Sequence, residues 1–342
     1  FIINGAMNVS QRSTSETGLG ASAGYFTVDR WDMYFTGTAG RLTQAQIADG
    51  PSGFANCMKL SCTTADTSIA AGENVILQQH IEGQNLQILK KGTSSAVPIT
   101  VSFWVKGNAS ATYTCGLWDN DNSRQNNQTF AVTTSWNRIE LTFAGDTSGA
   151  LDDDTANSLG FYIYLQAGST YTGGTFTSGT WASVTNANTV KSDQTQFFDS
   201  TDRTFFITGV QMEIGEKATE FEVESYETTL EKCRRYYQLY HNDSGSADYL
   251  QCVQAYNATT TFGEIKSFFR PMRTTPTVGS SGTFNQHQNN STASGSATPT
   301  LQSGSSNGWV ANGWGGITSL TAGNAVATSA TNGAKLTADA EL

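Results

Sequence analysis

Short segments in which apolar and polar residues alternate recur along most of this sequence, and clusters of Gly, Asn, Asp, Ser and Thr separate them. A period of two turns successive side chains to opposite faces, which is the pattern of a half-buried β-strand. The residues between the segments are those that satisfy or tolerate tight turns. The sequence therefore predicts an all-β fold built as an antiparallel sandwich. The expected strands lie at 27–35, 54–62, 75–81, 99–106, 112–118, 138–143, 159–165, 204–214, 247–256 and 261–269.

Two changes of pattern divide the chain. Residues 226–240 predict a helix, because apolar side chains recur there at helical spacing after the capping residue Ser225. From Thr277 onward Ser, Thr, Asn, Gly and Ala dominate, and a segment so poor in large apolar residues is expected to gain its order from neighbouring copies. We expect a β-sandwich domain at 1–224, a linking helix at 225–241, and a smaller β-rich domain at 242–342 that serves as an oligomerisation or tip region, with a homotrimer favoured.

The charge balance excludes several classes of partner. The chain has 19 Lys and Arg against 29 Asp and Glu, a formal net charge of −10 and a pI near 4.7. Such a surface repels phosphate backbones and anionic membranes, and the apolar runs are too short to cross a bilayer. We therefore expect no nucleic-acid partner and no membrane insertion.

The cysteines and the first residues bear on where the chain is made. The five cysteines are odd in number and lack CxxC spacing, which is typical of buried free thiols in a reducing cytoplasm. The chain opens at Phe1 without an initiator Met or a signal peptide, so we expect the remainder of a longer polypeptide.

No motif for catalysis is present. The three histidines lie outside metal-ligand spacing, and no GxSxG elbow or phosphate-binding Gly loop occurs. Asp119 with Asp121, or the run 152–154, supplies the carboxylate pair that glycoside hydrolysis needs. Each set lies in a loop rich in Asn, Ser or Gly, where we expect solvated carboxylates with ordinary pKa values, which make poor general acids. We expect no enzyme.

A calcium site is a further interpretation of the same loop. Asp119, Asp121 and Ser123 supply oxygen ligands at alternate positions, but Arg124 at the sixth position and Phe130 at the twelfth exclude an EF-hand. We therefore expect no bound metal and no cofactor.

Two places satisfy the simpler needs of sugar binding, a flat aromatic ring beside hydrogen-bonding side chains. Trp118 opens the segment 118–128, in which Asp119, Asp121 and Asn126 are candidate ligands of a glycan. Trp309 and Trp314 each follow an Asn-Gly pair, and they are the second candidate. Burial at a subunit contact is the favoured alternative for these two tryptophans.

Several segments occur in an order found in a known family. They are 1–12 (FIINGAMNVSQR), 25–31 (YFTVDRW), 101–106 (VSFWVK), 134–138 (TSWNR), 209–215 (GVQMEIG) and 218–237, which ends in CRRYY. These segments resemble bacteriophage tail-fibre and virion structural proteins over about residues 1–240. The resemblance implies a jelly roll similar to carbohydrate-binding modules, closed by a helix, within a virion component.

Together these observations predict a non-enzymatic virion structural protein, made in the cytoplasm of a bacterial host. We expect a tail-fibre subunit, or a head-fibre or decoration subunit, that contributes to adhesion to host-surface glycans. Its expected partners are other copies of itself, other virion proteins and a host cell-surface glycan. Two alternatives stay open: a fibre-borne polysaccharide depolymerase, and a free bacterial carbohydrate-binding module or adhesin.

Overall fold

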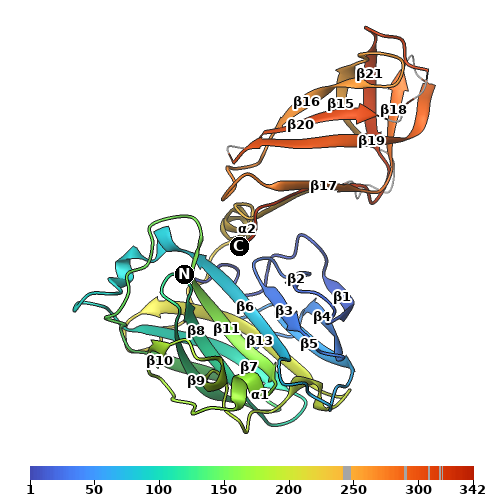
Figure 1. Ribbon diagram of the computed structural model, residues 1–342. Coiled ribbons are helices and arrows are strands. Elements are labelled where there is room, and N and C mark those ends of the chain that lie inside the picture. Colours follow the sequence, from blue (N-terminus) through green and yellow to red (C-terminus); the bar gives the residue numbers. More distant parts are fainter. Residues whose placement is uncertain (242–247, 289–290, 307–308, 316, 318) are drawn as a thin grey trace. The chain divides into compact units, whose positions relative to one another are not determined.

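The computed structural model describes residues 1–241, 248–288, 291–306, 309–315, 317 and 319–342. The chain divides into two units, residues 1–230 with Leu342 (unit 1) and residues 231–341 (unit 2). Each unit is built mainly from antiparallel strands, which confirms the predicted all-β fold (Figure 1). The division falls inside the helix that follows the predicted boundary at residue 224.

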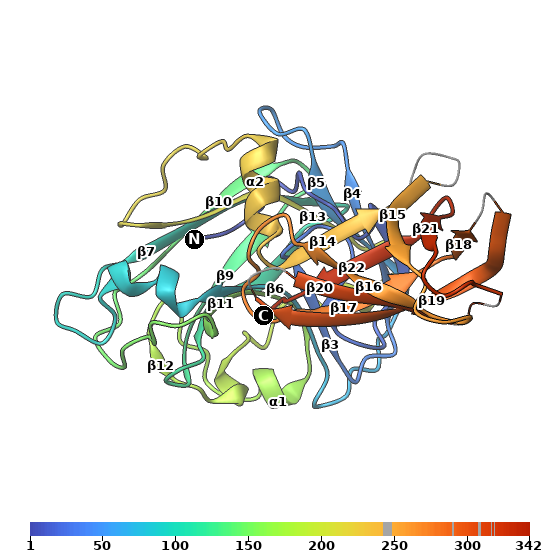
Figure 2. The same cartoon turned by 90° about the horizontal axis from the view of Figure 1, so that it is seen from above.

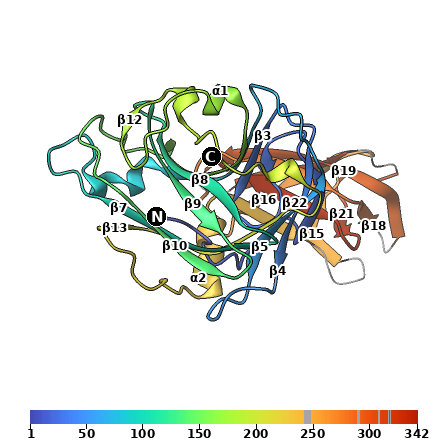
Figure 3. The same cartoon turned by 90° about the horizontal axis from the view of Figure 1, so that it is seen from below.

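Unit 1 is a jelly-roll sandwich of two antiparallel sheets. The six-stranded sheet has the order β1 (Ser15–Leu19), β4 (Arg41–Ile47), β5 (Cys57–Thr64), β13 (Thr204–Ile214), β7 (Ile99–Gly107) and β10 (Asn137–Phe143). The seven-stranded sheet has the order β12 (Ala182–Ser183), β9 (Arg124–Val132), β8 (Ala111–Asp119), β11 (Asn157–Ala167), β6 (Asn74–Glu82), β3 (Asp32–Thr36) and β2 (Gly24–Tyr25). Figure 3 shows β13, β7 and β10 of the first sheet side by side.

Aromatic rings from both sheets interlock between the layers. Phe103 of β7 contacts Phe130 of β9 edge-on, with ring centroids 5.1 Å apart, and also contacts Phe161 of β11 at 6.2 Å. Trp31 contacts Phe161 edge-on, with ring centroids 6.0 Å apart. All four side chains are buried, and this apolar burial is the main source of stability for unit 1.

Buried hydrogen bonds join two of the segments that carry the family resemblance, 1–12 and 25–31. The side chain of Asn4 donates to the carbonyls of Val9 (2.8 Å) and Asp29 (3.0 Å), and its Oδ1 accepts from the amides of Asn8 and Val9. The indole of Trp31 donates to the carbonyl of Asn4 at 3.2 Å. These bonds fix the chain just before β3, so the predicted strand 27–35 begins only at Asp32.

Short helices fill the connections of unit 1. They are η1 (Gly83–Asn85), η2 (Gln87–Leu89), α1 (Ser169–Thr172), η3 (Asn186–Asn188) and η4 (Phe197–Asp199).

The linking helix is shorter than predicted. Helix α2 spans Tyr226–Cys233, with the Ser225 hydroxyl accepting from the amide of Thr228 at its start. The predicted helix ran to residue 241, but Tyr237–His241 is strand β14, which pairs with β22 (Lys335–Asp339). Pairing with a strand far along the chain therefore overrides the helical spacing of the local sequence.

Unit 2 contains two smaller sheets. The three-stranded sheet has the order β14, β22 and β17 (Thr277–Ser281), strands that lie together in Figure 2. The six-stranded sheet has the order β15 (Asp248–Gln254), β21 (Ala325–Ala330), β18 (Phe284–Gln288), β19 (Ser291–Ser305), β20 (Trp309–Gly315) and β16 (Thr261–Ser267). Phe284 and Trp314 meet in its core with ring centroids 5.1 Å apart.

All five cysteines are free thiols, and Cys252 alone is exposed, so burial is confirmed for the other four. None of the helices in the described ranges has the length and apolar character needed to span a bilayer.

Candidate functional site

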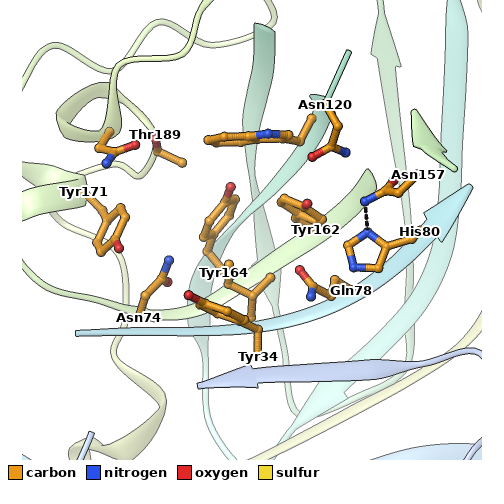
Figure 4. Close-up of a pocket in the computed structure, with 13 residues that line it drawn as sticks. Tyr34, Asn74, Gln78, His80, Asn120, Asn157, Tyr162, Tyr164, Tyr171 and Thr189 are labelled. Atoms are coloured by element: carbon orange, nitrogen blue, oxygen red, sulfur yellow. Dashed lines mark hydrogen bonds between the residues drawn. The ribbon is translucent and has the colours of Figure 1, made fainter. Parts of the chain in front are cut away.

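A pocket of about 480 Å³ lies on the outer face of the seven-stranded sheet in unit 1, open to solvent on one side (Figure 4). Its thirteen described lining residues come from β3, β6, β8 and β11, from the turns beside these strands, and from α1 and η3. They are Tyr34, Asn74, Ile76, Gln78, His80, Trp118, Asn120, Asn157, Tyr162, Tyr164, Tyr171, Asn186 and Thr189.

Strand register brings the floor of the pocket together. On β11, Tyr162 lies opposite Gln78 of β6 and Gly116 of β8, and Tyr164 lies opposite Ile76 of β6. Because side chains alternate along a strand, residues two apart share a face, and these floor residues all point away from the sandwich core.

Glycine next to the tyrosines makes room for their rings. A Cβ atom at Gly160 would lie 2.4 Å from the ring of Tyr162, closer than real contacts allow. The phenol ring of Tyr162 therefore packs directly against the backbone at position 160, where any side chain larger than that of glycine would overlap it. A Cβ atom at Gly116 would likewise lie 2.1 Å from the side-chain oxygen of Asn127.

Aromatic rings form much of the pocket surface. Trp118 and Tyr162 have ring centroids 6.0 Å apart and planes tilted by 31°, and Tyr164 meets Tyr162 edge-on at 6.1 Å. Tyr34 is 39 % exposed at one rim, and Tyr171 of α1 lies on the opposite side from Asn157 (Figure 4). Burial raises the pKa of Tyr162 and of Tyr164 above the ordinary phenol value, so both are neutral hydroxyls at physiological pH.

Amide side chains supply the polar part of the lining. Gln78 donates through Nε2 to the carboxylate of Asp32 at 2.5 Å. A carboxylate only accepts, so this bond fixes the amide orientation and leaves Oε1 of Gln78 as an acceptor. The side chain of Asn120 lies close to the phenol of Tyr162 and partly offsets the effect of burial on its pKa.

His80 lines the pocket as a neutral imidazole. Its Nδ1 lies 2.6 Å from the side-chain nitrogen of Asn157, as Figure 4 shows, and its ring meets Tyr162 edge-on at 6.0 Å. Burial, with the nearby Arg30 cation, lowers the pKa of His80 to about 4. The described lining contains no carboxylate, so the acid and nucleophile that glycoside hydrolysis requires are not supplied by these thirteen residues.

The sequence candidates around Trp118 separate in the structure. Trp118 lines the pocket, but Asp119 is fully buried at the end of β8, facing away from it. The expectation that Asn126 is a glycan ligand is corrected as well, because Asn126 lies in β9 opposite Leu117 and is buried in the sandwich interior. Asp121 is exposed in the turn and accepts from the amide of Asp152 at 2.9 Å. The segment 118–128 is thus the end of a strand, a turn and a second strand rather than a loop.

Lys91 explains why Asp119 is not a solvated carboxylate. Its ammonium group lies 2.5 Å from Asp119 and 3.1 Å from Asp146, and it donates to the carbonyls of Ser148 (2.8 Å) and Gly149 (2.9 Å). This side chain therefore stands where the calcium interpretation of the loop would need a cation. Within the described residues, no group of three or more His, Cys, Asp or Glu side chains is placed to hold a metal ion.

The second sequence candidate is also corrected in part. Trp314 is 1 % exposed and packs in the core of unit 2, so it presents no surface to a glycan. Trp314 is buried by contacts inside unit 2 itself, so its burial does not depend on the subunit contact that was the alternative. Trp309 begins β20, and its side chain lies outside the described residues.

Sequence reasoning missed the tyrosines of the pocket. Tyr162 and Tyr164 stand at alternate positions of a predicted strand, which places them on one face. The Tyr-x-Tyr spacing beside Gly160 is the sequence feature from which a shared aromatic face could have been predicted.

Comparisons with known proteins show a limited likeness in structure. No family model matches the sequence, and no curated protein matches it. A structure described as "CBM4 structure and function" has a TM-score of 0.32 and 12 % identity, covering 63 % of this chain and 100 % of that one.

Two similar structures hold sugars. The family 11 carbohydrate-binding module from Clostridium thermocellum, with a β-1,3-1,4-mixed-linked tetrasaccharide, has a TM-score of 0.30 and 14 % identity, covering 61 % of this chain and 99 % of that one. TmCBM61, with β-1,4-galactotriose, has a TM-score of 0.30 and 9 % identity, covering 54 % of this chain and 88 % of that one. These scores are too low to support an argument about function, which depends on the pocket itself.

Proposed function

We propose that unit 1 binds glycans in the pocket on its seven-stranded sheet, without catalysis. The observation that supports this most directly is the combination of clustered aromatic rings with amide side chains in one open pocket. Aromatic faces pack against the apolar faces of sugar rings, and amides exchange hydrogen bonds with hydroxyl groups. A volume of about 480 Å³ is within the usual range for small-ligand sites and suits a short oligosaccharide segment.

Affinity electrophoresis of the full chain through gels containing different polysaccharides tests the proposal. We expect retardation by at least one polysaccharide, and loss of that retardation in Trp118→Ala, because a half-buried aromatic residue is often the centre of a binding site. Trp136→Ala is the matched control, since Trp136 is also half-buried but contacts Phe206 of the six-stranded sheet. Equal loss in both variants, or no loss in Trp118→Ala, would refute the pocket as the site.

We further propose that the whole chain is a virion structural protein, a tail-fibre subunit or a head-fibre or decoration subunit that assembles as a homotrimer. The resemblance of residues 1–12 and 25–31 to phage fibre proteins supports this proposal. The buried hydrogen bonds of Asn4 give those residues a structural role. Light scattering of the full chain checks the trimer, and a monomer would count against the fibre proposal. Immunogold labelling of virions checks the location.

The two alternatives differ in what they require of the pocket. A depolymerase needs paired carboxylates beside the sugar, whereas Asp119 is buried against Lys91 and the described lining contains no acid. Release of reducing ends from the bound polysaccharide would favour it. A free carbohydrate-binding module or adhesin fits the pocket equally well, and a monomer that labels no virion would favour that alternative.

A further inference from the structure

We infer that the pocket selects uncharged, hydroxyl-rich glycans and rejects both acidic and cationic ones. This inference rests on the proposed function and names the class of ligand for the same site. It follows from the charge and the hydrogen-bonding capacity of the lining, taken in turn.

The described lining contains no Asp, Glu, Lys or Arg. His80, the one imidazole, is neutral at physiological pH, and the phenols of Tyr162 and Tyr164 keep their protons. A carboxylate, sulfate or ammonium group entering the pocket would therefore lose water without gaining a counter-ion. A neutral hydroxyl loses far less, because amides and phenols replace its hydrogen bonds.

Two buried charges of opposite sign contact lining residues, and both are already engaged by the protein. Asp32 accepts from Gln78, and Arg30 donates to the carbonyl of His80 at 2.7 Å. Arg30 is 1 % exposed and Asp32 is 7 % exposed, so neither presents its charge to the open pocket.

The polarity of the lining also favours ligands that both donate and accept. Asp32 fixes Gln78 with its carbonyl oxygen as the remaining acceptor, so a ligand must donate to it. A carboxylate or sulfate only accepts, and an ammonium only donates. The tyrosine hydroxyls and the other amides can each donate and accept, and a sugar hydroxyl is a group that can use both capacities.

The test compares polysaccharides that differ in charge, using the full chain in affinity electrophoresis at low and at high salt. The neutral probes are galactan, mannan and mixed-linkage β-glucan; the acidic probes are polygalacturonate and alginate; the cationic probe is chitosan. We expect Trp118-dependent retardation by a neutral probe only, at least about tenfold stronger than by any charged probe, and little changed by salt.

A change of charge at the rim makes the test sharper. Asn120 is an exposed lining residue, so Asn120→Lys places a cation at the pocket with little disturbance of the fold. We expect Asn120→Lys to gain retardation by an acidic probe. Ser135→Lys, an exposed position next to Trp136 outside the lining, adds the same charge elsewhere and should gain none.

The outcomes separate this inference from the proposed function. Trp118-dependent binding of polygalacturonate, alginate or chitosan as strong as that of the neutral probes overturns the inference and leaves glycan binding intact. An equal gain in Asn120→Lys and Ser135→Lys also overturns it. Absence of Trp118-dependent retardation by every probe refutes the proposed function, and the inference with it.

Discussion

Replacement of Lys91 by methionine should destabilise unit 1 strongly, because its ammonium group is the centre of a buried charge cluster. The Lys91 side chain is 5 % exposed and contacts Asp119 and Asp146, whose side chains are 0 % and 3 % exposed. Asp146 keeps a second partner in Lys91→Met, since Arg124 bonds both of its oxygens at 2.6 and 2.9 Å. Asp119 keeps only the amide groups of Asn122.

The magnitude follows from the buried carboxylate that loses its cation. Removing one partner of a buried ion pair typically costs about 3–5 kcal/mol in the free energy of unfolding. Methionine has nearly the volume of the lysine stem, so packing adds little to this cost. We expect a loss of about 3 kcal/mol at pH 7, measured by urea unfolding, and recovery of much of it in the double variant Lys91→Met with Asp119→Asn, which removes the uncompensated charge.

The effect of pH provides a second check. Lys91→Met removes one of the two cations that lower the pKa of Asp146, so the stability of this variant should depend less on pH in acid than that of the wild type. In the wild type, burial alone would raise the pKa of Asp146, but its bonds to Arg124 and Lys91 outweigh burial and lower that pKa. The stability from Asp146 is therefore present above its unfolded pKa and is lost as the pH falls through the lower folded value. A loss below about 1 kcal/mol at pH 7, or no recovery in the double variant, would refute this account of the cluster.

Three further predictions concern the pocket and unit 2. Gly160→Ala should displace the ring of Tyr162 and weaken glycan binding at least about tenfold, whereas Gly72→Ala, at a site with no close neighbour, should leave binding unchanged in the same gels. The folded pKa of His80 is about 4, below the ordinary value of 6.5, so its contribution to stability is present above pH 6.5 and is lost as the pH falls from 6.5 to 4. Urea unfolding over this range should show a loss of about 2 kcal/mol in the free energy of unfolding of the wild type, and His80→Gln should abolish that loss. Trp314→Ala should cost about 3–5 kcal/mol in the unfolding of unit 2, and a smaller cost by thermal or urea unfolding would contradict its place in that core.

Alternation in the sequence predicts the strands that have one apolar face, but it does not show which face stays open. Strands β7 and β13 were predicted nearly to their ends for this reason. Tyr162 and Tyr164 were assigned to a strand without a role, because tyrosine serves equally in a core and in a binding pocket. Only the pairing of β11 with β6 and β8 places them beside Trp118 and Gln78.

Strand β9 was missed because the interior positions at its start are polar. Asn126 and Gln128 face the sandwich interior opposite Leu117 and Cys115, so no apolar alternation marks this stretch. The amide of Gln128 donates to the carbonyl of Thr142 in the other sheet, which gives a polar residue a structural use. Asp119 was misjudged for a related reason, since its partner Lys91 is distant in the sequence.

The most direct test of the account is the mobility of the wild type, Trp118→Ala and Trp136→Ala in one set of polysaccharide gels. The account predicts that a neutral polysaccharide retards the wild type and Trp136→Ala, while Trp118→Ala migrates as it does in a gel without polysaccharide. Retardation of all three proteins alike would show that the pocket on the seven-stranded sheet is not the glycan site.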